Sequence, residues 1–331
     1  MNKETRTKRR KLAFIITPIF LLLSVLIGLI SGSITIPLHE IWSILITGDS
    51  SAHSVILLDL RLPRVLIGLL TGACLAASGA ILQSVMRNPL ADPGIIGVSA
   101  GGGLAAVITM VMLPQFSFLL PAAAFVGALS ASLIIYFLSW DKGASPIKIV
   151  LAGVAVNALV GAIMNGVMVV YSDRVQAVLP WLSGGLNGRS WHHFSFMLPY
   201  ALVGLLLTIP AIKSANLLLL SDDSARLLGQ KVELQRLLLI LLSALLAGIA
   251  VSAAGLVGFV GLVVPHMVRL LIGDDYRYLL PVSIINGAAL VVIADAAARS
   301  LFNPVELPVG ILLACIGAPF FLYLLRRSNC R

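Results

Sequence analysis

The fold of this chain is decided by one stretch, residues 61–103, which reads RLPRVLIGLLTGACLAASGAILQSVMRNPLADPGIIGVSAGGG. Its run from 62 to 86 is apolar and exceeds the roughly 20 residues that a helix needs to cross a bilayer. An Asn-Pro pair at 88–89 and Asp-Pro-Gly at 92–94 then force a tight, non-helical turn. A second apolar run follows that turn. The stretch therefore predicts two membrane helices joined by a short polar connection.

The first of these helices carries a ridge of small residues. Gly68, Gly72, Ala76 and Ala80 recur every four positions. This spacing puts them on one helix face, where small side chains let another backbone approach closely. We expect the ridge to serve helix packing.

The composition extends this pattern to the whole chain. Of 331 residues, 59% are hydrophobic and 11% are charged, against about 25% charged in a soluble domain. We therefore expect an all-α, polytopic membrane protein with about ten transmembrane helices, some of them short or interrupted by glycine. The expected spans are 12–30, 62–86, 94–112, 119–138, 146–171, 194–212, 232–254, 256–271, 279–301 and 308–325.

The N-terminus combines six basic residues with an apolar run from Leu12 that is longer than the core of a signal peptide, so we expect an uncleaved first membrane helix. Short amphipathic pieces are expected near Pro37 and at 175–182. An even number of helices puts both termini on one side. With that side cytoplasmic, all but five of the 23 Lys and Arg residues fall inside, in agreement with the positive-inside rule.

The net charge of +9 therefore reports membrane orientation. The basic residues are scattered over joins and tails, so a nucleic-acid partner is not expected. The three cysteines show neither a metal-binding spacing nor a disulfide framework. We expect no cofactor and no metal site.

Residues 214–236 form a polar island among the apolar runs, with charges of both signs. Ser221 is a suitable N-cap, Asp222 lies in the first turn, and Gly229 is a natural residue to end a short helix. Asp222 and Arg226 lie four apart on one face. The island is either an ordinary loop between helices or a docking element for a cytoplasmic partner.

Two patterns raise the question of catalysis or ion coupling. Residues 97–101 match Gly-x-Ser-x-Gly, but a nucleophile elbow needs a strand before the serine, and none is expected here. An intramembrane serine protease using Ser99 and His266 remains an alternative. Asp295 inside a membrane segment suggests an ion-coupled secondary transporter, although Arg299 one turn later offers it a structural partner.

No Gly-Lys pair occurs, so the chain lacks a Walker A nucleotide site, and ATP-driven transport would need another subunit. Three outward arginines, Arg61, Arg64 and Arg299, either snorkel at the interface or recognise an acidic patch.

Seven blocks of the chain resemble the FecCD-type permease family of ABC importers for iron–siderophores, haem and cobalamin. They occur in the family's order and span nearly the whole chain. The blocks are RLPR (61–64), NPLADPGIIGVSAGGG (88–103), VLAGVAVNAL (150–159), WLSGGLNG (181–188), SARLLG (224–229), GLVGFVGLVVPHMVRLL (255–271) and ELPVGILLACIGAPFFLYLL (306–325).

The resemblance implies a single transmembrane permease domain over 1–331, with inverted repeats formed by helices two to five and seven to ten. Residues 12–213 would carry helices one to six, 214–236 the cytoplasmic coupling loop, and 232–325 helices seven to ten. The implied function is the permease subunit of an importer for an iron–siderophore, or alternatively for cobalamin or haem.

The implied partners are two ATPase subunits that hydrolyse ATP, a second permease subunit that is the same chain or a paralogue, and an extracytoplasmic substrate-binding protein. The chain itself would not be an enzyme. It would lie in the cytoplasmic membrane, crossing it many times, with both termini in the cytoplasm.

The resemblance also implies roles for particular residues. Arg61, Arg64 and Arg299 would meet acidic residues of the substrate-binding protein. The inner gate would fall on Gly143, Ala144, Ser145, Pro146 and Ile147. Coupling to the ATPase would use Leu217, Leu220, Ser221, Asp222, Ser224, Ala225, Arg226, Leu227, Leu228 and Gly229.

Overall fold

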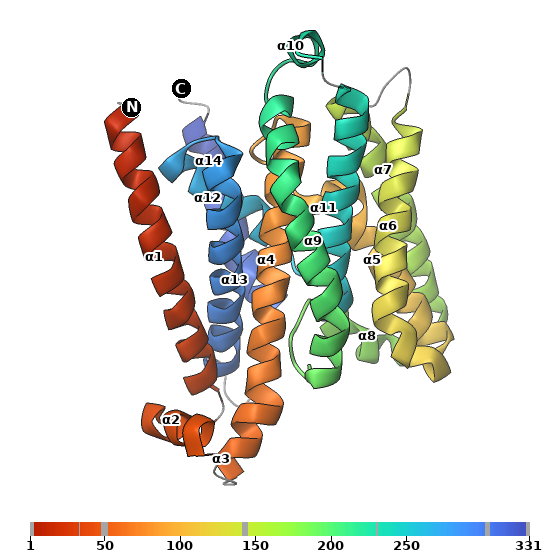
Figure 1. Ribbon diagram of the computed structural model, residues 1–331. Helices are drawn as coiled ribbons and strands as arrows, with labels where there is room; N and C mark the ends of the chain where they lie inside the picture. The colour runs from red at the N-terminus through yellow and green to blue at the C-terminus, as the bar shows by residue number, and fades with distance from the viewer. Residues whose placement is uncertain are drawn as a thin grey trace.

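The computed structural model describes residues 3–32, 34–47, 52–140, 145–229, 231–301 and 305–328. Most of these residues are helical (Figure 1). The longer helices are α1 (Lys3–Ile30), α4 (Leu62–Met86), α6 (Leu120–Leu138), α7 (Pro146–Val170), α9 (Trp191–Leu218), α11 (Val232–Ala254), α13 (Tyr276–Ser300) and α14 (Val309–Ser328). The shorter α-helices are α2 (Leu38–Thr47), α3 (Ala52–Val55), α5 (Val98–Val107), α8 (Val175–Leu182), α10 (Asp222–Leu227) and α12 (Val260–Ile272). Short 3-10 or π-helical pieces lie at Ile56–Arg61, Pro93–Ile96, Ile108–Met112, Pro114–Leu119 and Ser172–Arg174.

Each of the ten expected spans overlaps a helix. Among the described residues, seven helices are long and apolar enough to cross a membrane, and three shorter apolar helices cover Val98–Met112, Val260–Ile272 and Val309–Tyr323. The amphipathic pieces expected near Pro37 and at 175–182 are α2 and α8. The expectation of an irregular bundle with short members is confirmed.

One expected span begins later than its hydropathy indicates. The span 256–271 is helical only from Val260, because the chain at 255–259 is not helical, with φ of +71° at Gly255 and +67° at Phe259. Irregular backbone in a membrane must find partners inside the protein. Here the Leu256 amide donates to the Trp181 carbonyl at 3.4 Å, and just before the irregular stretch the Ala254 carbonyl accepts from the Gly185 amide at 2.8 Å.

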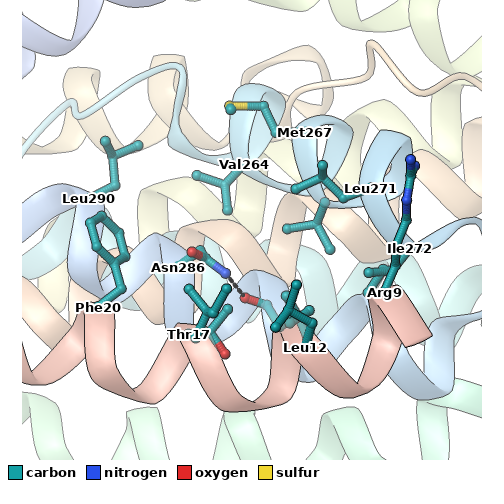
Figure 2. A pocket seen from close by; sticks show the side chains of 14 residues that line it. Arg9, Leu12, Thr17, Phe20, Val264, Met267, Leu271, Ile272, Asn286 and Leu290 are labelled. Carbon is teal, nitrogen blue, oxygen red and sulfur yellow. Dashed lines mark hydrogen bonds between the residues drawn. The ribbon is translucent and has the colours of Figure 1, made fainter. Parts of the chain in front are cut away.

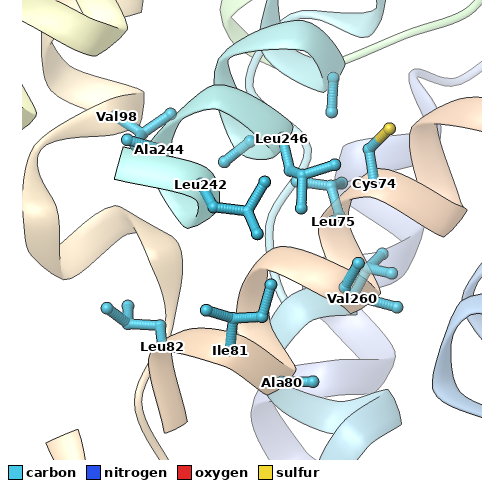
Figure 3. Packing of buried hydrophobic residues seen from close by; sticks show 14 of the residues in the cluster. Cys74, Leu75, Ala80, Ile81, Leu82, Val98, Leu242, Ala244, Leu246 and Val260 are labelled. Atoms are coloured by element: carbon cyan, nitrogen blue, oxygen red, sulfur yellow. The ribbon is translucent and has the colours of Figure 1, made fainter. Parts of the chain in front are cut away.

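Helices α4 and α11 form the centre of the molecule. The most apolar windows of these two helices are 83% and 78% buried, whereas that of α7 is 17% buried. Side chains from α4, α5, α11 and α12 interlock there, among them Leu75 and Ile81 of α4 and Leu242 and Leu246 of α11 (Figure 3). Helices α1, α6, α7 and α9 form the outer wall.

The small-residue ridge packs as expected. A Cβ added to Gly72 would collide with the backbone of Gly287 on α13. One added to Gly287 would lie only 2.4 Å from the Ala76 Cβ atom on α4, which is too close for two carbon atoms. The Tyr276 hydroxyl at the start of α13 donates to the Ala80 carbonyl at 2.7 Å. Small residues therefore let α4 and α13 approach to backbone contact.

The central pair runs in opposite directions, because α4 leads toward the end that carries α10 and α11 leads away from it (Figure 1). Ser78 and Ser243 join the two helices reciprocally, each hydroxyl donating to the other residue's carbonyl, at 2.7 and 3.1 Å. Helix α4 packs most extensively on α13, and α11 packs extensively on α6. In each case a helix of one expected repeat packs on a helix of the other, as two interlocking inverted repeats would. The repeat itself stays a prediction.

Two ends of the bundle differ in what they carry. The chain termini and α10 lie at one end, and α2, α3 and α8 lie at the other (Figure 1). This arrangement matches the sequence expectation that the termini and the polar island share a side. We refer below to the end with α10 as the inner end and to the opposite one as the outer end.

Candidate coupling and docking sites

The polar island forms the short helix α10 at the inner end. The Ser221 hydroxyl accepts a hydrogen bond from the Ser224 amide at 3.2 Å and caps the helix, as expected. Gly229 follows the helix with φ of +75°, a conformation that most other side chains disfavour. A six-residue helix is marginal by itself in water, so its position depends on contacts with the bundle.

Asp222 supplies the main contact. Its carboxylate accepts two hydrogen bonds at 3.0 Å from the Arg236 guanidinium on α11 and another from Arg87 at the end of α4. The Arg236 side chain is 2% exposed, and Arg87 also donates to the Leu218 carbonyl at the end of α9. One carboxylate therefore links α10 to three helices, including both members of the central pair. We call Asp222, Arg236 and Arg87 the inner clamp.

The charges of the clamp also set the ionisation of Asp222. Partial burial by itself would raise the pKa of this carboxyl, but hydrogen bonds from Arg236 and Arg87 and their positive charges outweigh burial. The pKa of Asp222 is therefore lowered below its ordinary value. The carboxylate is fully charged at neutral pH and keeps both arginines as partners.

The i,i+4 neighbours Asp222 and Arg226 do not pair with each other. Arg226 donates instead to Glu233 at 3.2 Å, at the start of α11. Asp222 binds Arg236 and Arg87, which come from other helices, instead of its local neighbour Arg226. Arg226 and Glu233 thereby add a second tie between α10 and α11.

Several leucines of α10 and its flanks point away from the bundle. Leu220, Leu227 and Leu228 are exposed, and Leu227 is 88% exposed. Ala225, on the opposite side of the helix, is fully buried. Leu217 lies within the last turn of α9 rather than in the loop. Exposed apolar side chains gathered on a short polar helix are typical of an interaction site.

The three outer arginines are buried and bonded within the chain. Arg64 binds Asp295 through two hydrogen bonds of 2.9 Å and binds Glu306 through another of 2.9 Å. Arg299 pairs with the same Asp295 at 3.2 Å and donates to the Gly28 carbonyl at 3.0 Å. This gives Asp295 two arginine partners, so the structural alternative for this residue is present.

Arg61 has only carbonyl partners among its described hydrogen bonds. It donates to the Leu29 and Ile30 carbonyls at the end of α1, at 2.7 and 2.9 Å, and also to the Ile34 carbonyl that follows α1. Its guanidinium therefore fastens the first membrane helix to α4. That these arginines also contact a substrate-binding protein stays a prediction.

All three arginines nevertheless line one hollow at the outer end, with a volume of about 370 Å³. We call it the outer hollow. Its remaining charged members are Asp59, Arg189 and Glu306. The Arg189 Nε atom is buried without a hydrogen-bond partner, and burial lowers the pKa of this guanidinium. The lining has four arginines and two carboxylates, so its net charge is positive. Asp295 is not part of the lining but pairs with two of these arginines.

The expected inner gate is only partly described. Gly143 and Ala144 lie outside the described residues. Ser145 caps α7 by accepting from the Lys148 amide at 3.3 Å, Pro146 is the first residue of α7, and the Ile147 side chain is 74% exposed. These positions form a helix start, and a gating role stays a prediction.

The Gly-x-Ser-x-Gly pattern serves helix packing. Gly97 has φ of +82° and precedes α5 directly, and Gly101 approaches the Gly127 backbone of α6 so closely that a Cβ would collide with it. Ser99 therefore lies in the first turn of a helix with no preceding strand in its neighbourhood. Among the described residues, no group of three or more His, Cys, Asp or Glu side chains could hold a metal ion.

Sequence reasoning did not single out the partners that complete these sites. Arg87 and Arg236 belong to the Lys and Arg residues that the charge count places on the cytoplasmic side, and Glu306 lies within a block that resembles the family; none of the three was assigned a role. One signal existed for Arg87, because it follows a long apolar run directly and precedes Asn-Pro. A charged residue at that position lies at the end of a helix, where polar side chains of neighbouring loops can bind it.

Comparison with known proteins identifies relatives over nearly the full length. A family model described as the FecCD transport family matches residues 20–327. The Fe(3+)-citrate import system permease protein YfmD of Bacillus subtilis (strain 168) is 39% identical over 328 residues, which cover 99% of this chain and 98% of the relative. The hemin transport system permease protein HmuU of Yersinia pestis is 41% identical over 310 residues, 90% of each chain. A solved structure of an inward-facing metal-chelate type ABC transporter superposes with a TM-score of 0.86 at 28% identity, covering 96% of this chain and 99% of that one.

Proposed function

The chain belongs to the FecCD transport family, and from this premise we propose that it carries an iron–siderophore chelate into the cytoplasm as one permease subunit of an ATP-driven importer. Two ATPase subunits bind at the inner end, a second permease subunit completes the pathway, and a substrate-binding protein delivers the chelate at the outer end. Haem and cobalamin are the alternative cargoes. The chain lies in the cytoplasmic membrane with both termini in the cytoplasm.

The observation that carries this proposal is the exposed leucine surface of α10 held by the inner clamp. Leu227 and Leu228 offer an apolar contact to a partner, and Asp222 ties that contact to α4 and α11. A push on α10 is therefore transmitted to the helices at the centre of the bundle. That connection is what an ATPase needs in order to change access between the two sides.

Transport itself is tested by uptake in cells that lack the chromosomal copy of this gene. Cells carrying the wild-type chain should accumulate radioactive iron supplied as ferric citrate or a ferric hydroxamate, and cells carrying Asp222→Asn should accumulate much less. If cells carrying the wild-type chain take up haemin or cobalamin but no iron–siderophore, the cargo is haem or cobalamin instead. Retained uptake after the partner ATPase gene is removed would rule out the ATP-driven mechanism.

Docking of the binding protein is proposed at the outer hollow, where an acidic side chain would meet the arginines. Because Arg64 and Arg299 are paired with Asp295, replacing them risks unfolding as well as loss of docking. Asp59→Asn is a cleaner change, since it removes an exposed carboxylate from the hollow. Asp59 would repel an acidic side chain of the binding protein, so its removal should tighten the affinity for that protein by about fivefold, or roughly 1 kcal/mol.

The matched control is Asp173→Asn, which removes an exposed carboxylate elsewhere at the outer end. Affinity is measured by surface plasmon resonance with the permease in nanodiscs. An equal effect of both variants would indicate diffuse surface charge. No effect of Asp59→Asn would place docking away from the hollow.

A further inference from the structure

An apolar groove runs along the first membrane helix, outside the sites described above. Its volume is about 500 Å³, and its walls come from α1 on one side and from α12 and α13 on the other (Figure 2). Leu12, Ile16 and Phe20 of α1 face Val264 and Leu271 of α12 across it. Polar lining is sparse, and the Asn286 amide within it is satisfied by the Val282 carbonyl at 2.8 Å.

The length of the groove matches one leaflet of a bilayer. Arg9 marks its inner end and Phe20 its deep end. At about 1.5 Å per helical residue these two positions are about 16 Å apart along α1. Half of a hydrocarbon core that is about 30 Å thick is about 15 Å. The groove therefore covers the depth of a single acyl chain in the leaflet at the inner end.

The inner end of the groove is positively charged. Arg9 lines the mouth, and Arg10 donates to the Ile272 carbonyl, which closes α12. Arg6 packs on Gly273 just beyond that helix, and its Nε atom is buried without a hydrogen-bond partner. The nearby acids have cations of their own, since Asp274 pairs with Arg269 and Asp275 lies 3.9 Å from Arg10.

We propose that this groove binds an anionic phospholipid, with one acyl chain between α1 and α12 and the phosphate at the Arg9 end. Basic pockets between membrane helices at the cytoplasmic side bind anionic headgroups in this way. Charge complementarity at the mouth selects an anionic lipid over a zwitterionic one. The side chains along the groove are large, with little of the small-residue character that helix–helix contacts favour, so a lipid chain fits it better than a helix of a second copy.

The lipid would complete the packing of α1, whose apolar window is only 22% buried within the chain. Helix α1 contacts mainly α13 and leaves the side toward α12 to the groove. An acyl chain there fills the space between α1 and α12 and fixes the first helix against the bundle. The proposal does not depend on the transported cargo.

Native mass spectrometry of the full-length chain tests the proposal, with phosphatidylglycerol and phosphatidylcholine of identical acyl chains as probes. The wild-type chain should bind phosphatidylglycerol more tightly. Arg9→Gln should weaken that binding by about fivefold and leave phosphatidylcholine unchanged. Lys8→Gln is the matched control, because Lys8 is exposed on the same helix and does not line the groove.

A second pair of variants tests the groove itself. Ala13 lines it, and Ala13→Phe should lower binding of both lipids by about fivefold or more, whereas Ile15→Phe on the exposed face of α1 should not. Equal binding of the two lipids by the wild-type chain would refute headgroup recognition. Equal losses in Arg9→Gln and Lys8→Gln would refute the groove as the site. A dimer of the chain that disappears in Ala13→Phe would show a second copy in the groove and overturn the proposal.

Discussion

Truncating Leu227 is the most direct test of how this permease engages its proposed ATPase. The side chain is 88% exposed at the inner end, so almost all of its apolar surface is available for burial by a partner. Burying a leucine contributes about 1.5–3 kcal/mol, and ordering it at an interface costs about 0.5–1.5 kcal/mol. The net contribution is about 1.5 kcal/mol, so Leu227→Ala should weaken ATPase affinity by roughly tenfold.

The measurement is the dissociation constant between the nanodisc-embedded permease and its purified ATPase, by microscale thermophoresis. Leu60→Ala is the matched control, because Leu60 is also exposed but lies at the outer end, beside the outer hollow. It should leave the ATPase affinity unchanged. The thermal unfolding temperature of Leu227→Ala should stay at the wild-type value, since an exposed leucine contributes little to folding.

Two results would refute this reasoning. An affinity of Leu227→Ala within about twofold of wild type would mean that the ATPase does not bury the exposed surface of α10. A comparable loss in Leu60→Ala would mean that the assay reports general damage to the membrane domain. A tenfold loss with normal stability, in Leu227→Ala alone, would place the ATPase contact on α10.

Asp222→Asn should speed amide exchange across α10 and reduce transport per ATP hydrolysed, because Arg236 stays buried without its full counter-charge. The pKa of Asp222 is lowered in the folded chain, so the ionised carboxylate stabilises α10 fully above the ordinary pKa range of a carboxyl group. This stabilisation is lost as the pH falls through the lowered pKa of the folded state. Below about pH 4 the amide exchange of α10 should therefore become faster in the wild type and stay unchanged in Asp222→Asn. Arg64→Gln should lower stability by about 3 kcal/mol in denaturant titration, since it leaves the buried Asp295 with one partner; an unchanged midpoint would contradict the buried network. Gly72→Ala should lower the thermal unfolding temperature markedly because its Cβ has no room beside α13, whereas Gly166→Ala, with open space around it, should be neutral or stabilising.

Local features of the fold could be read from the chain because they depend on neighbouring residues. The ten expected spans overlap ten helices, since a run of apolar residues must form backbone hydrogen bonds within itself in a bilayer. Ser221 and Gly229 bound α10 as expected, because capping involves residues only a few positions apart. The ridge on α4 was also readable, since a four-residue spacing defines a helix face in any context.

Long-range partners could not be read in the same way. Asp222 and Arg87 are 135 positions apart, and Arg64 and Asp295 are 231 apart. No periodicity connects such residues, because their distance depends on how the helices cross. The three outer arginines were recognised as a group, and Arg299 was named as a possible partner of Asp295, but their burial and the pairing of Arg64 with Asp295 and Glu306 were not foreseen.

The sequence by itself located ten apolar helices and the short capped helix of the polar island. How many of them cross the membrane and which end faces the cytoplasm stay predictions from the sequence. These properties follow from hydropathy, charge asymmetry and capping, each of which acts within a few residues or sums over the chain. Only the tertiary structure decided that Asp222 clamps α10 to α4 and α11, and that Asp295 holds Arg64 beside the outer hollow. The pairs of Asp222 with Arg87 and of Asp295 with Arg64 join helices far apart in sequence, so they exist only after backbone contact at glycines such as Gly72 has fixed how the helices pack.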